Sequence, residues 1–160
     1  MYRIGYGYDV HRLEAGRKFI LGGVFITDEF GPVAHSDGDV LLHALCDALL
    51  GAAALGDIGQ HFPDSASEFK GISSLELLRR VLLLIKDAGF RVVNSDATIL
   101  LEAPKIMHRA MEMRESIARV LEITPQAVSI KATTSEQVGF IGRREGIAAH
   151  CVVLLQLGQS

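Results

Sequence analysis

The sequence predicts an α+β fold in which a one-layer β-sheet packs on helices. Three segments have the apolar spacing of a helix with a capping residue or a breaker at an end, and they span about residues 36–51, 73–89 and 107–121. Strand-like runs outnumber them, and the last, Ile147 to Leu155, has almost no polar alternation. Three helices can cover one face of a sheet, so this apolar strand indicates that a partner subunit covers the other.

Length and composition indicate one globular domain over residues 1–160, with 49% hydrophobic and 22% charged residues. The net charge of −3 and the lack of a Lys/Arg run argue against a nucleic-acid partner. No signal-peptide pattern or membrane-spanning apolar stretch is evident, so we expect no membrane partner. Cys46 and Cys151 form no C-x-x-C pair, which favours a reducing compartment, and a soluble cytoplasmic domain is expected.

The first strand carries half of a possible metal site. In Gly5-Tyr6-Gly7-Tyr8-Asp9-Val10-His11, alternation places Asp9 and His11 on one face and Val10 on the other. A carboxylate and an imidazole both suit Zn²⁺ at about 2.0–2.2 Å. Alone, such a pair is more often an ordinary surface aspartate beside a hydrogen-bonded histidine, so the interpretation as a zinc site depends on a third ligand.

Turn and hairpin signals follow the first strand. We expect a turn at Glu14–Gly16, a hairpin of Phe19–Leu21 and Val24–Ile26 around Gly22-Gly23, and a polar loop over 27–32.

The first predicted helix has a polar stripe on an otherwise apolar surface. Ser36 and the acidic residue three positions on resemble a capping box, and Asp39, His43 and Asp47 then recur every four residues. A stripe facing solvent and a pair of acids supporting a metal-bound imidazole are both compatible with this pattern. Cys46 could reach the same metal, although a free cysteine is usually a small buried residue.

The remaining elements are marked by caps and breakers. In chain order we expect a long loop over 55–65 that continues to Gly71, a helix capped by Ser73 and Glu76, a strand from Arg91 to Leu101, a helix from Met107 to Leu121, a strand from Val128 toward Glu136, and a glycine-marked turn over 140–146.

Nine short motifs follow one another along the chain. They are Gly7-Tyr8-Asp9-Val10-His11, His35-Ser36-Asp37-Gly38-Asp39-Val40, His43-Ala44-Leu45, Leu55-Gly56-Asp57-Ile58-Gly59, Phe62-Pro63-Asp64, Phe69-Lys70-Gly71, Ala103-Pro104-Lys105, Lys131-Ala132-Thr133-Thr134 and Gly142-Arg143-x-Glu145-Gly146. In this order they resemble one enzyme family, the 2-C-methyl-D-erythritol 2,4-cyclodiphosphate synthases, and the resemblance spans nearly the whole chain. It implies a phosphorus–oxygen lyase of non-mevalonate isoprenoid and terpenoid biosynthesis, assembled as a homotrimer with active sites between adjacent subunits.

The resemblance also implies a reaction and two metals. The substrate would be 4-diphosphocytidyl-2-C-methyl-D-erythritol 2-phosphate, whose 2-phosphate attacks the β-phosphorus and expels CMP. Zn²⁺, or another divalent transition metal, would bind Asp9, His11 and His43. His43 would thus be the third ligand that the pair on the first strand lacks. Mg²⁺ or Mn²⁺ would bind Glu136 and the substrate phosphates. His35 and Thr134 match residues that stabilise the transition state by hydrogen bonding.

The matching contact residues form three groups. The erythritol phosphate side comprises His35, Ser36, Asp47, Asp57, Ile58, Gly59, Phe62, Pro63, Asp64, Ser65 and Ala66, and the cytidine diphosphate side comprises Leu101, Glu102, Ala103, Pro104, Lys105, Ile106, Met107, Thr133, Thr134, Ser135 and Glu136. Phe140 and Arg143 match the wall of an axial cavity that can take an isoprenoid diphosphate. Two departures are Ser65-Ala66-Ser67, where the family commonly has Thr-Asp-Pro, and Arg144, where it has Gly.

Three alternatives remain open on the sequence. A zinc-dependent phosphohydrolase would use the same three ligands to activate water. A non-catalytic domain would close a structural zinc site with a fourth ligand, for which Cys46 is the candidate. Arg143 could pair with Glu145 at the surface instead of lining an axial cavity.

Overall fold

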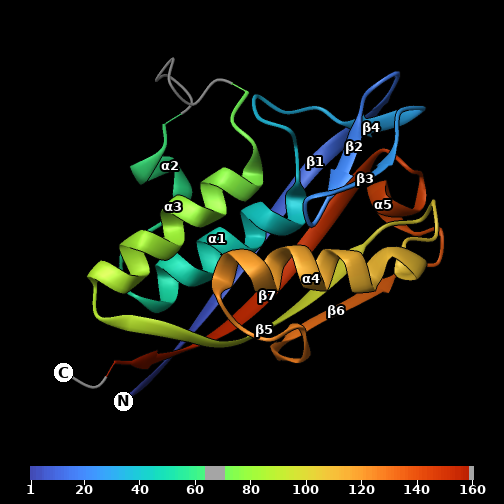
Figure 1. Cartoon of the computed structure of the whole chain (residues 1–160). Coiled ribbons are helices and arrows are strands. Elements are labelled where there is room, and N and C mark those ends of the chain that lie inside the picture. Colours follow the sequence, from blue (N-terminus) through green and yellow to red (C-terminus); the bar gives the residue numbers. More distant parts are fainter. Residues whose placement is uncertain (64–70, 159–160) are drawn as a thin grey trace.

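The computed structural model of the chain describes residues 1–63 and 71–158, and its main feature is a mixed five-stranded sheet with helices over one face (Figure 1). The strand order is β4-β1-β7-β5-β6, and only the β5–β6 pair is parallel among the pairs of this sheet in the described chain. The strands are β1 (Tyr2–Ala15), β4 (Phe30–Pro32), β5 (Phe90–Leu100), β6 (Val128–Thr133) and β7 (Gly146–Leu157). This arrangement confirms the predicted α+β class.

The predicted hairpin is present, and the predicted loop after it is partly wrong. Strands β2 (Phe19–Leu21) and β3 (Val24–Thr27) pair with each other as a separate two-stranded sheet. Residues 30–32 form β4 instead of ending the loop, and they pair with the last residues of β1, Leu13 to Ala15. The long β1 offers this edge because its pairing with β7 ends at Arg12.

Three longer helices cover one face of the sheet: α1 (Val40–Ala52), α3 (Ser74–Asp87) and α4 (Ala110–Leu121). The shorter helices are α2 (Ile58–His61), α5 (Gly139–Gly142), η2 (Met107–Arg109) and η3 (Pro125–Ala127). Two of them correct the expectation of irregular structure, since α2 lies in the expected long loop and α5 in the expected turn. The capping-box prediction was also wrong: Asp39, not Ser36, is the N-cap of α1, and its side chain accepts the Leu42 N–H.

Helix α1 approaches β1 unusually closely because β1 has glycine where the helix crosses it. A Cβ added at Gly5 would lie 1.8 Å from the carbonyl oxygen of Ala48, and one at Gly7 would lie 1.9 Å from that of Ala44. Any side chain at these two positions would therefore push the helix away from the strand. Because these two glycines have no side chain, α1 lies within reach of Asp9 and His11, which follow on the same face of β1.

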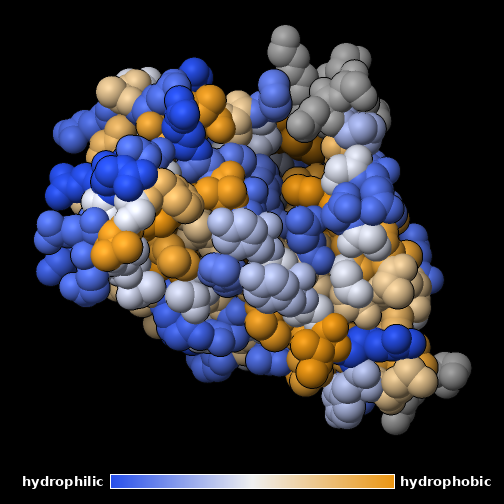
Figure 2. Space-filling model, turned by 180° about the vertical axis from the view of Figure 1, so that it is seen from behind, coloured by the Kyte–Doolittle hydropathy of each residue, from blue (hydrophilic) through white to orange (hydrophobic). Residues whose placement is uncertain are grey.

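The two faces of the sheet differ in burial. On the helix side, Ile147 and Cys151 of β7 are buried, whereas on the opposite side Ile4, Tyr6 and Val152 are 74%, 59% and 44% exposed. Figure 2 shows the molecule from behind, where apolar side chains are spread among polar ones. Within one chain, the second face of β7 is only partly buried, since Ala148 is buried there and Val152 is not. Covering the rest of that face, as the sequence predicts, would require another molecule.

No helix in the described parts of the chain is long and apolar enough to cross a membrane.

Candidate active site

Asp9, His11 and His43 form a compact cluster of three possible metal ligands. The Asp9 Oδ2 atom lies 3.0 Å from His11 Nε2 and 3.0 Å from His43 Nδ1, and these two nitrogens lie 3.3 Å apart. Strand β1 supplies the first two residues on its helix-facing side, and α1 supplies His43 from across the glycine contact. The fold therefore brings together the strand pair and the third ligand that the resemblance implies.

The geometry of the cluster fits zinc. Three ligand atoms at about 2.0–2.1 Å from a tetrahedral ion are about 3.3 Å from one another, and a set of three leaves one position open. The observed separations of 3.0–3.3 Å are close to that value. Cys46 is not part of this group; it is fully buried, and burial raises the pKa of its thiol well above the ordinary range. A fourth protein ligand from Cys46 is therefore not favoured.

The electrostatics of the cluster also suit a cation. Burial raises the pKa of Asp9, but hydrogen bonds and charge from His11 and His43 outweigh it and lower the pKa to about 2. Burial lowers the pKa of His43, but the hydrogen bond to Asp9 and the charges of Asp9, Asp39 and Asp37 outweigh it and raise the pKa. Asp9 is accordingly an anion at neutral pH, and its charge favours a cation beside it.

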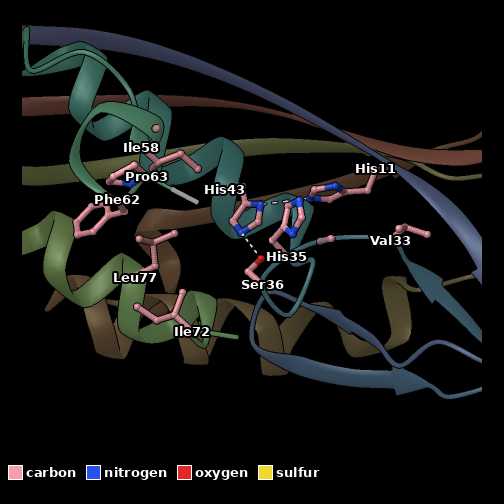
Figure 3. A pocket seen from close by; sticks show the side chains of 12 residues that line it. His11, Val33, His35, Ser36, His43, Ile58, Phe62, Pro63, Ile72 and Leu77 are labelled. Carbon is pink, nitrogen blue, oxygen red and sulfur yellow. Dashed lines mark hydrogen bonds between the residues drawn. The ribbon is translucent and has the colours of Figure 1, made fainter. Parts of the chain in front are cut away.

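The far side of the His43 ring contacts two hydroxyl groups. His43 Nε2 lies 3.1 Å from Ser74 Oγ. It lies 3.2 Å from Ser36 Oγ, a contact drawn as a dashed line in Figure 3. Ser74 is fully buried at the start of α3, and both its hydroxyl and its backbone N–H donate to the carboxylate of Asp37. Ser74 and Asp37 were not predicted as site residues. Asp37 lies within a quoted motif, but nothing local to Ser74 marks it.

The stripe of Asp39, His43 and Asp47 is not a solvent-facing stripe. Asp39 is fully buried and accepts the backbone N–H groups of Gly22 and Gly23 at 2.9 and 2.7 Å, which fixes the β2–β3 hairpin to α1. Burial raises the pKa of Asp39 to about 6 against the opposing effect of its N–H donors. Asp47 accepts the Ile58 N–H. Each acid thus holds a backbone segment.

A pocket of about 440 Å³ opens beside the histidines. In Figure 3, the imidazoles of His11, His35 and His43 lie toward one end and the side chains of Phe62 and Leu77 toward the other. Predicted contact residues that line this pocket are His35, Ser36, Ile58, Gly59, Phe62 and Pro63, and residues that the prediction missed are Val33, Ala34, Ile72 and Leu77. The missed residues are mostly apolar, and no chemical signal distinguishes them from core residues.

Asp57, also a predicted contact residue, does not line this pocket. Asp57 caps α2 by accepting the backbone N–H and the side-chain amide of Gln60 at 3.1 and 2.8 Å. Asp64, Ser65 and Ala66 lie outside the described residues.

A second pocket, of about 280 Å³, lies at the ends of β5 and β6. Its lining includes predicted cytidine-side residues, namely Leu101, Glu102, Pro104, Lys105, Ile106, Met107, Thr133 and Thr134. Glu102 accepts the Ser135 N–H at 3.2 Å, which joins the two strand ends, and Ala103 precedes Pro104 through a cis peptide bond. The two pockets share no lining residue.

Thr134 lines the second pocket, and neither Thr134 nor Glu136 belongs to the cluster of Asp9, His11 and His43. Both side chains are exposed, and Thr134 Oγ1 donates to Glu136 Oε1 at 3.4 Å. Aligned pairs cross the sheet from Asp9 through Ala149 and Ile99 to Ala132. Three steps at about 4.8 Å each separate β1 from β6 by roughly 14 Å. Within one chain, the two groups of predicted residues are therefore apart.

Arg143 forms a surface ion pair with Glu145, which was one of the alternatives left open by the sequence. Its Nε and Nη2 atoms donate to Glu145 Oε1 and Oε2 at 2.9 and 3.1 Å. Phe140, on α5, is 41% exposed. His150 faces the exposed side of the sheet, where its Nδ1 lies 2.7 Å from the Tyr6 hydroxyl.

Comparisons with known proteins identify close relatives. The model of the YgbB family matches residues 2–156. The 2-C-methyl-D-erythritol 2,4-cyclodiphosphate synthase of Syntrophomonas wolfei subsp. wolfei is 58% identical over 154 residues, which are 96% of this chain and 98% of that protein. The bifunctional IspDF from Campylobacter jejuni superposes with a TM-score of 0.94 at 41% identity, covering 98% of this chain and 42% of that one. A CDP complex of IspF from Plasmodium falciparum gives a TM-score of 0.87 at 32% identity, covering 99% and 97%.

Proposed function

The chain belongs to the YgbB family, and we infer that it has 2-C-methyl-D-erythritol 2,4-cyclodiphosphate synthase activity, as a lyase of the non-mevalonate isoprenoid pathway. The observation that carries this inference is the cluster of Asp9, His11 and His43, whose two histidines line a pocket, in a chain with 58% identity to a synthase of that name. We further propose that residues 1–160 act as a single domain.

In the proposed reaction, an oxygen of the substrate 2-phosphate forms a bond to the β-phosphorus. The bond from that phosphorus to the oxygen bridging the α- and β-phosphates breaks, and CMP leaves with the electron pair. A bound metal supplies positive charge and an open position for a phosphate oxygen. No protein nucleophile is needed, which agrees with the complete burial of Cys46 and near-complete burial of Cys151.

The residues of the chain orient the reactants and stabilise charge. His35 and Ser36 line the pocket beside the cluster, where they can donate hydrogen bonds to the 2-phosphate. Ile58, Phe62 and Leu77 give the pocket apolar walls, which restrict water around the methylerythritol chain. Thr134 and Glu136 would act at the diphosphate, with Glu136 as the protein ligand of Mg²⁺ or Mn²⁺.

The separation of the two pockets supports a homotrimer with active sites between subunits. We propose that the metal pocket of one subunit faces the cytidine pocket of its neighbour, because a single chain holds these pockets on strands about 14 Å apart. The exposed sheet face of Ile4, Tyr6 and Val152 supplies an apolar surface for the contact. Burial of this sheet face in the proposed trimer would also account for the apolar sequence of β7.

A charge on that sheet face tests the trimer. Val152→Arg is expected to dissociate the assembly toward the 17.3 kDa chain in analytical ultracentrifugation and to remove activity. Leu83→Arg is the matched control, because Leu83 is 47% exposed on α3, against 44% for Val152 on the sheet. A wild-type chain that sediments as a monomer and is active would contradict the shared site.

We also propose an isoprenoid diphosphate as an axial ligand of the trimer. Symmetry would gather three copies of Arg143 and Phe140, and an anion would offset the repulsion between the guanidinium groups. Farnesyl or geranyl diphosphate should raise the melting temperature, and Arg143→Ala should remove most of the rise. An equal rise in melting temperature for the wild type and for Arg143→Ala would show that Arg143 does not hold this ligand. Arg143 would then have only its surface ion pair with Glu145.

Phosphorus NMR of the products tests the main proposal. The synthase reaction gives a cyclic diphosphate and CMP from the cytidine diphosphate substrate. Release of inorganic phosphate instead would favour the phosphohydrolase alternative.

A further inference from the structure

The imidazole of His43 has a defined contact on each side. Its Nδ1 faces Asp9 Oδ2 at 3.0 Å and belongs to the metal cluster, while its Nε2 faces Ser74 Oγ at 3.1 Å. A neutral imidazole carries one proton, and a metal can bind only the nitrogen that lacks it. The tautomer of His43 therefore decides whether Nδ1 can act as a ligand.

The contacts of Ser74 fix the direction of its hydrogen bond to His43. A serine hydroxyl has one hydrogen, and that of Ser74 donates to Asp37 Oδ1. A carboxylate accepts only, so the hydrogen cannot be shared with His43. Ser74 Oγ must then accept from the ring, which places the ring proton on Nε2 and leaves Nδ1 unprotonated.

Asp37 is itself held in place by three donors. Its Oδ2 accepts the Ser74 N–H at 2.8 Å, and its Oδ1 accepts the Ser74 hydroxyl and, at 3.2 Å, the Asp39 N–H. Asp37 thereby caps the start of α3, whereas the side chain of Ser73, the N-cap residue, makes no cap bond. The loop before α1 and the first turn of α3 are joined at this carboxylate.

Ser36 adds a weaker second acceptor. Its Oγ lies 3.2 Å from His43 Nε2 and accepts the Gly38 N–H at 3.2 Å. Ser36 lines the open pocket, whereas Ser74 is fully buried and shielded from competing water. Ser74 is thus the stronger constraint on the ring.

We propose that Ser74, oriented by Asp37, is a positioning residue that keeps the proton of His43 on Nε2 and presents Nδ1 to the metal. The inference rests on the metal centre of the proposed function. Outer partners of this kind typically contribute about 10–100-fold to metal affinity. The chain Asp37–Ser74–His43 would do so through a hydroxyl placed between the carboxylate and the imidazole.

Two substitutions test the relay in different ways. Ser74→Ala removes the stronger acceptor of the ring proton and leaves only Ser36 Oγ. Asp37→Asn can reverse the relay, because an amide NH₂ can donate to Ser74 Oγ and free the serine hydrogen to point at Nε2, which favours a proton on Nδ1. Ser73→Ala is the matched control, since it changes the adjacent serine at the same helix start without touching the relay.

Zinc affinity is measured by competition with a chelating dye, with circular dichroism of the metal-free proteins as the folding check. We expect Ser74→Ala and Asp37→Asn to weaken zinc binding by about 10–100-fold and Ser73→Ala by less than about twofold. Folded variants of Ser74 and Asp37 with wild-type affinity would overturn the proposal. Failure of the wild type itself to bind zinc would instead overturn the metal centre.

A spectrum of the wild type tests the tautomer without any substitution. Long-range ¹H–¹⁵N correlation of the zinc-loaded protein should show His43 bound through Nδ1 and protonated at Nε2. Metal binding through Nε2 would exclude the relay even if a variant failed to fold.

Discussion

The carboxylate of Asp47 accepts the backbone N–H of Ile58, with 2.8 Å between Oδ1 and N. Ile58 is the first residue of α2, and both it and Gly59 line the metal pocket. Asp47 is itself absent from the lining of that pocket. Its direct contact is therefore with the wall of the pocket, through the first turn of α2.

Asp47→Ala is expected to raise KM about tenfold and to leave bound zinc unchanged. The lost hydrogen bond is worth about 1–1.5 kcal/mol and frees the α2 turn, while the metal ligands are untouched. Asp47→Asn keeps an acceptor oxygen and should stay close to wild type. Steady-state kinetics measures KM and metal analysis measures bound zinc. An equal rise in KM for Asp47→Ala and Asp47→Asn would indicate instead that the charge of Asp47 contacts the substrate.

Gly7→Ala should destabilise the protein by about 3 kcal/mol and weaken zinc binding. The added Cβ would lie 1.9 Å from the Ala44 carbonyl oxygen, so α1 must shift and carry His43 away from Asp9. Gly51→Ala, on α1 itself, is the control, because nothing lies within 4 Å of a Cβ added there. It should stabilise the protein by about 0.5–1 kcal/mol. Chemical denaturation and zinc titration measure both; unaltered stability in Gly7→Ala would contradict the close approach.

Asp39→Ala is expected to lower the free energy of unfolding by about 2–4 kcal/mol. The substitution leaves the N–H groups of Gly22 and Gly23 without their acceptor and removes the α1 cap. Asp57→Ala removes a cap from the exposed α2 and should have a much smaller effect. Urea unfolding compares the two, and similar losses would show that burial of Asp39 matters little.

Acid should reveal the low pKa of Asp9 in the metal-free protein. A carboxyl group whose pKa is about 2 when folded and 3.8 when unfolded stabilises the fold above pH 3.8, and this contribution is lost as the pH falls toward 2. The difference in unfolding free energy between wild type and Asp9→Asn should therefore fall by about 2 kcal/mol from pH 5 to pH 2. Denaturation with a chelator present measures it, and a constant difference across that range would refute the interpretation.

Glu136→Gln should reduce turnover severely while zinc stoichiometry stays at the wild-type value. Glu136 is exposed beside Thr134 and lies outside the cluster formed by Asp9 and the two histidines. Metal analysis with a turnover assay separates the two metals. Loss of zinc from this variant would mean that Glu136 contributes to the first metal site.

Local patterns predicted the elements well and the contacts between them poorly. Alternation placed Asp9 and His11 on one face, and Gly22-Gly23 marked the hairpin, because both depend on neighbouring residues. The pairing of 30–32 with β1 and the packing of α3 beside His43 depend on tertiary contacts, so β4 and Ser74 were missed.

The third ligand illustrates the same limit. The sequence alone left His43 with a polar stripe that could face solvent, and only the resemblance to a family joined it to Asp9. In the structure, the glycines of β1 make that connection, since they allow α1 to approach the strand. The predicted roles of His35, Thr134 and the cytidine-side residues remain predictions.

The order of strands determines when the metal centre can form. Tyr2 pairs with Gln156 and Arg12 with Gly146, so the first strand of the chain has the last one as its neighbour along the sheet. During synthesis, the segment bearing Asp9 and His11 leaves the ribosome long before the segment of β7, and it lacks this partner until β7 has been made. Contacts of such large sequence separation slow folding, because a long loop must close before they form. Asp9 and His11 therefore reach their final surroundings only after β7 has been made.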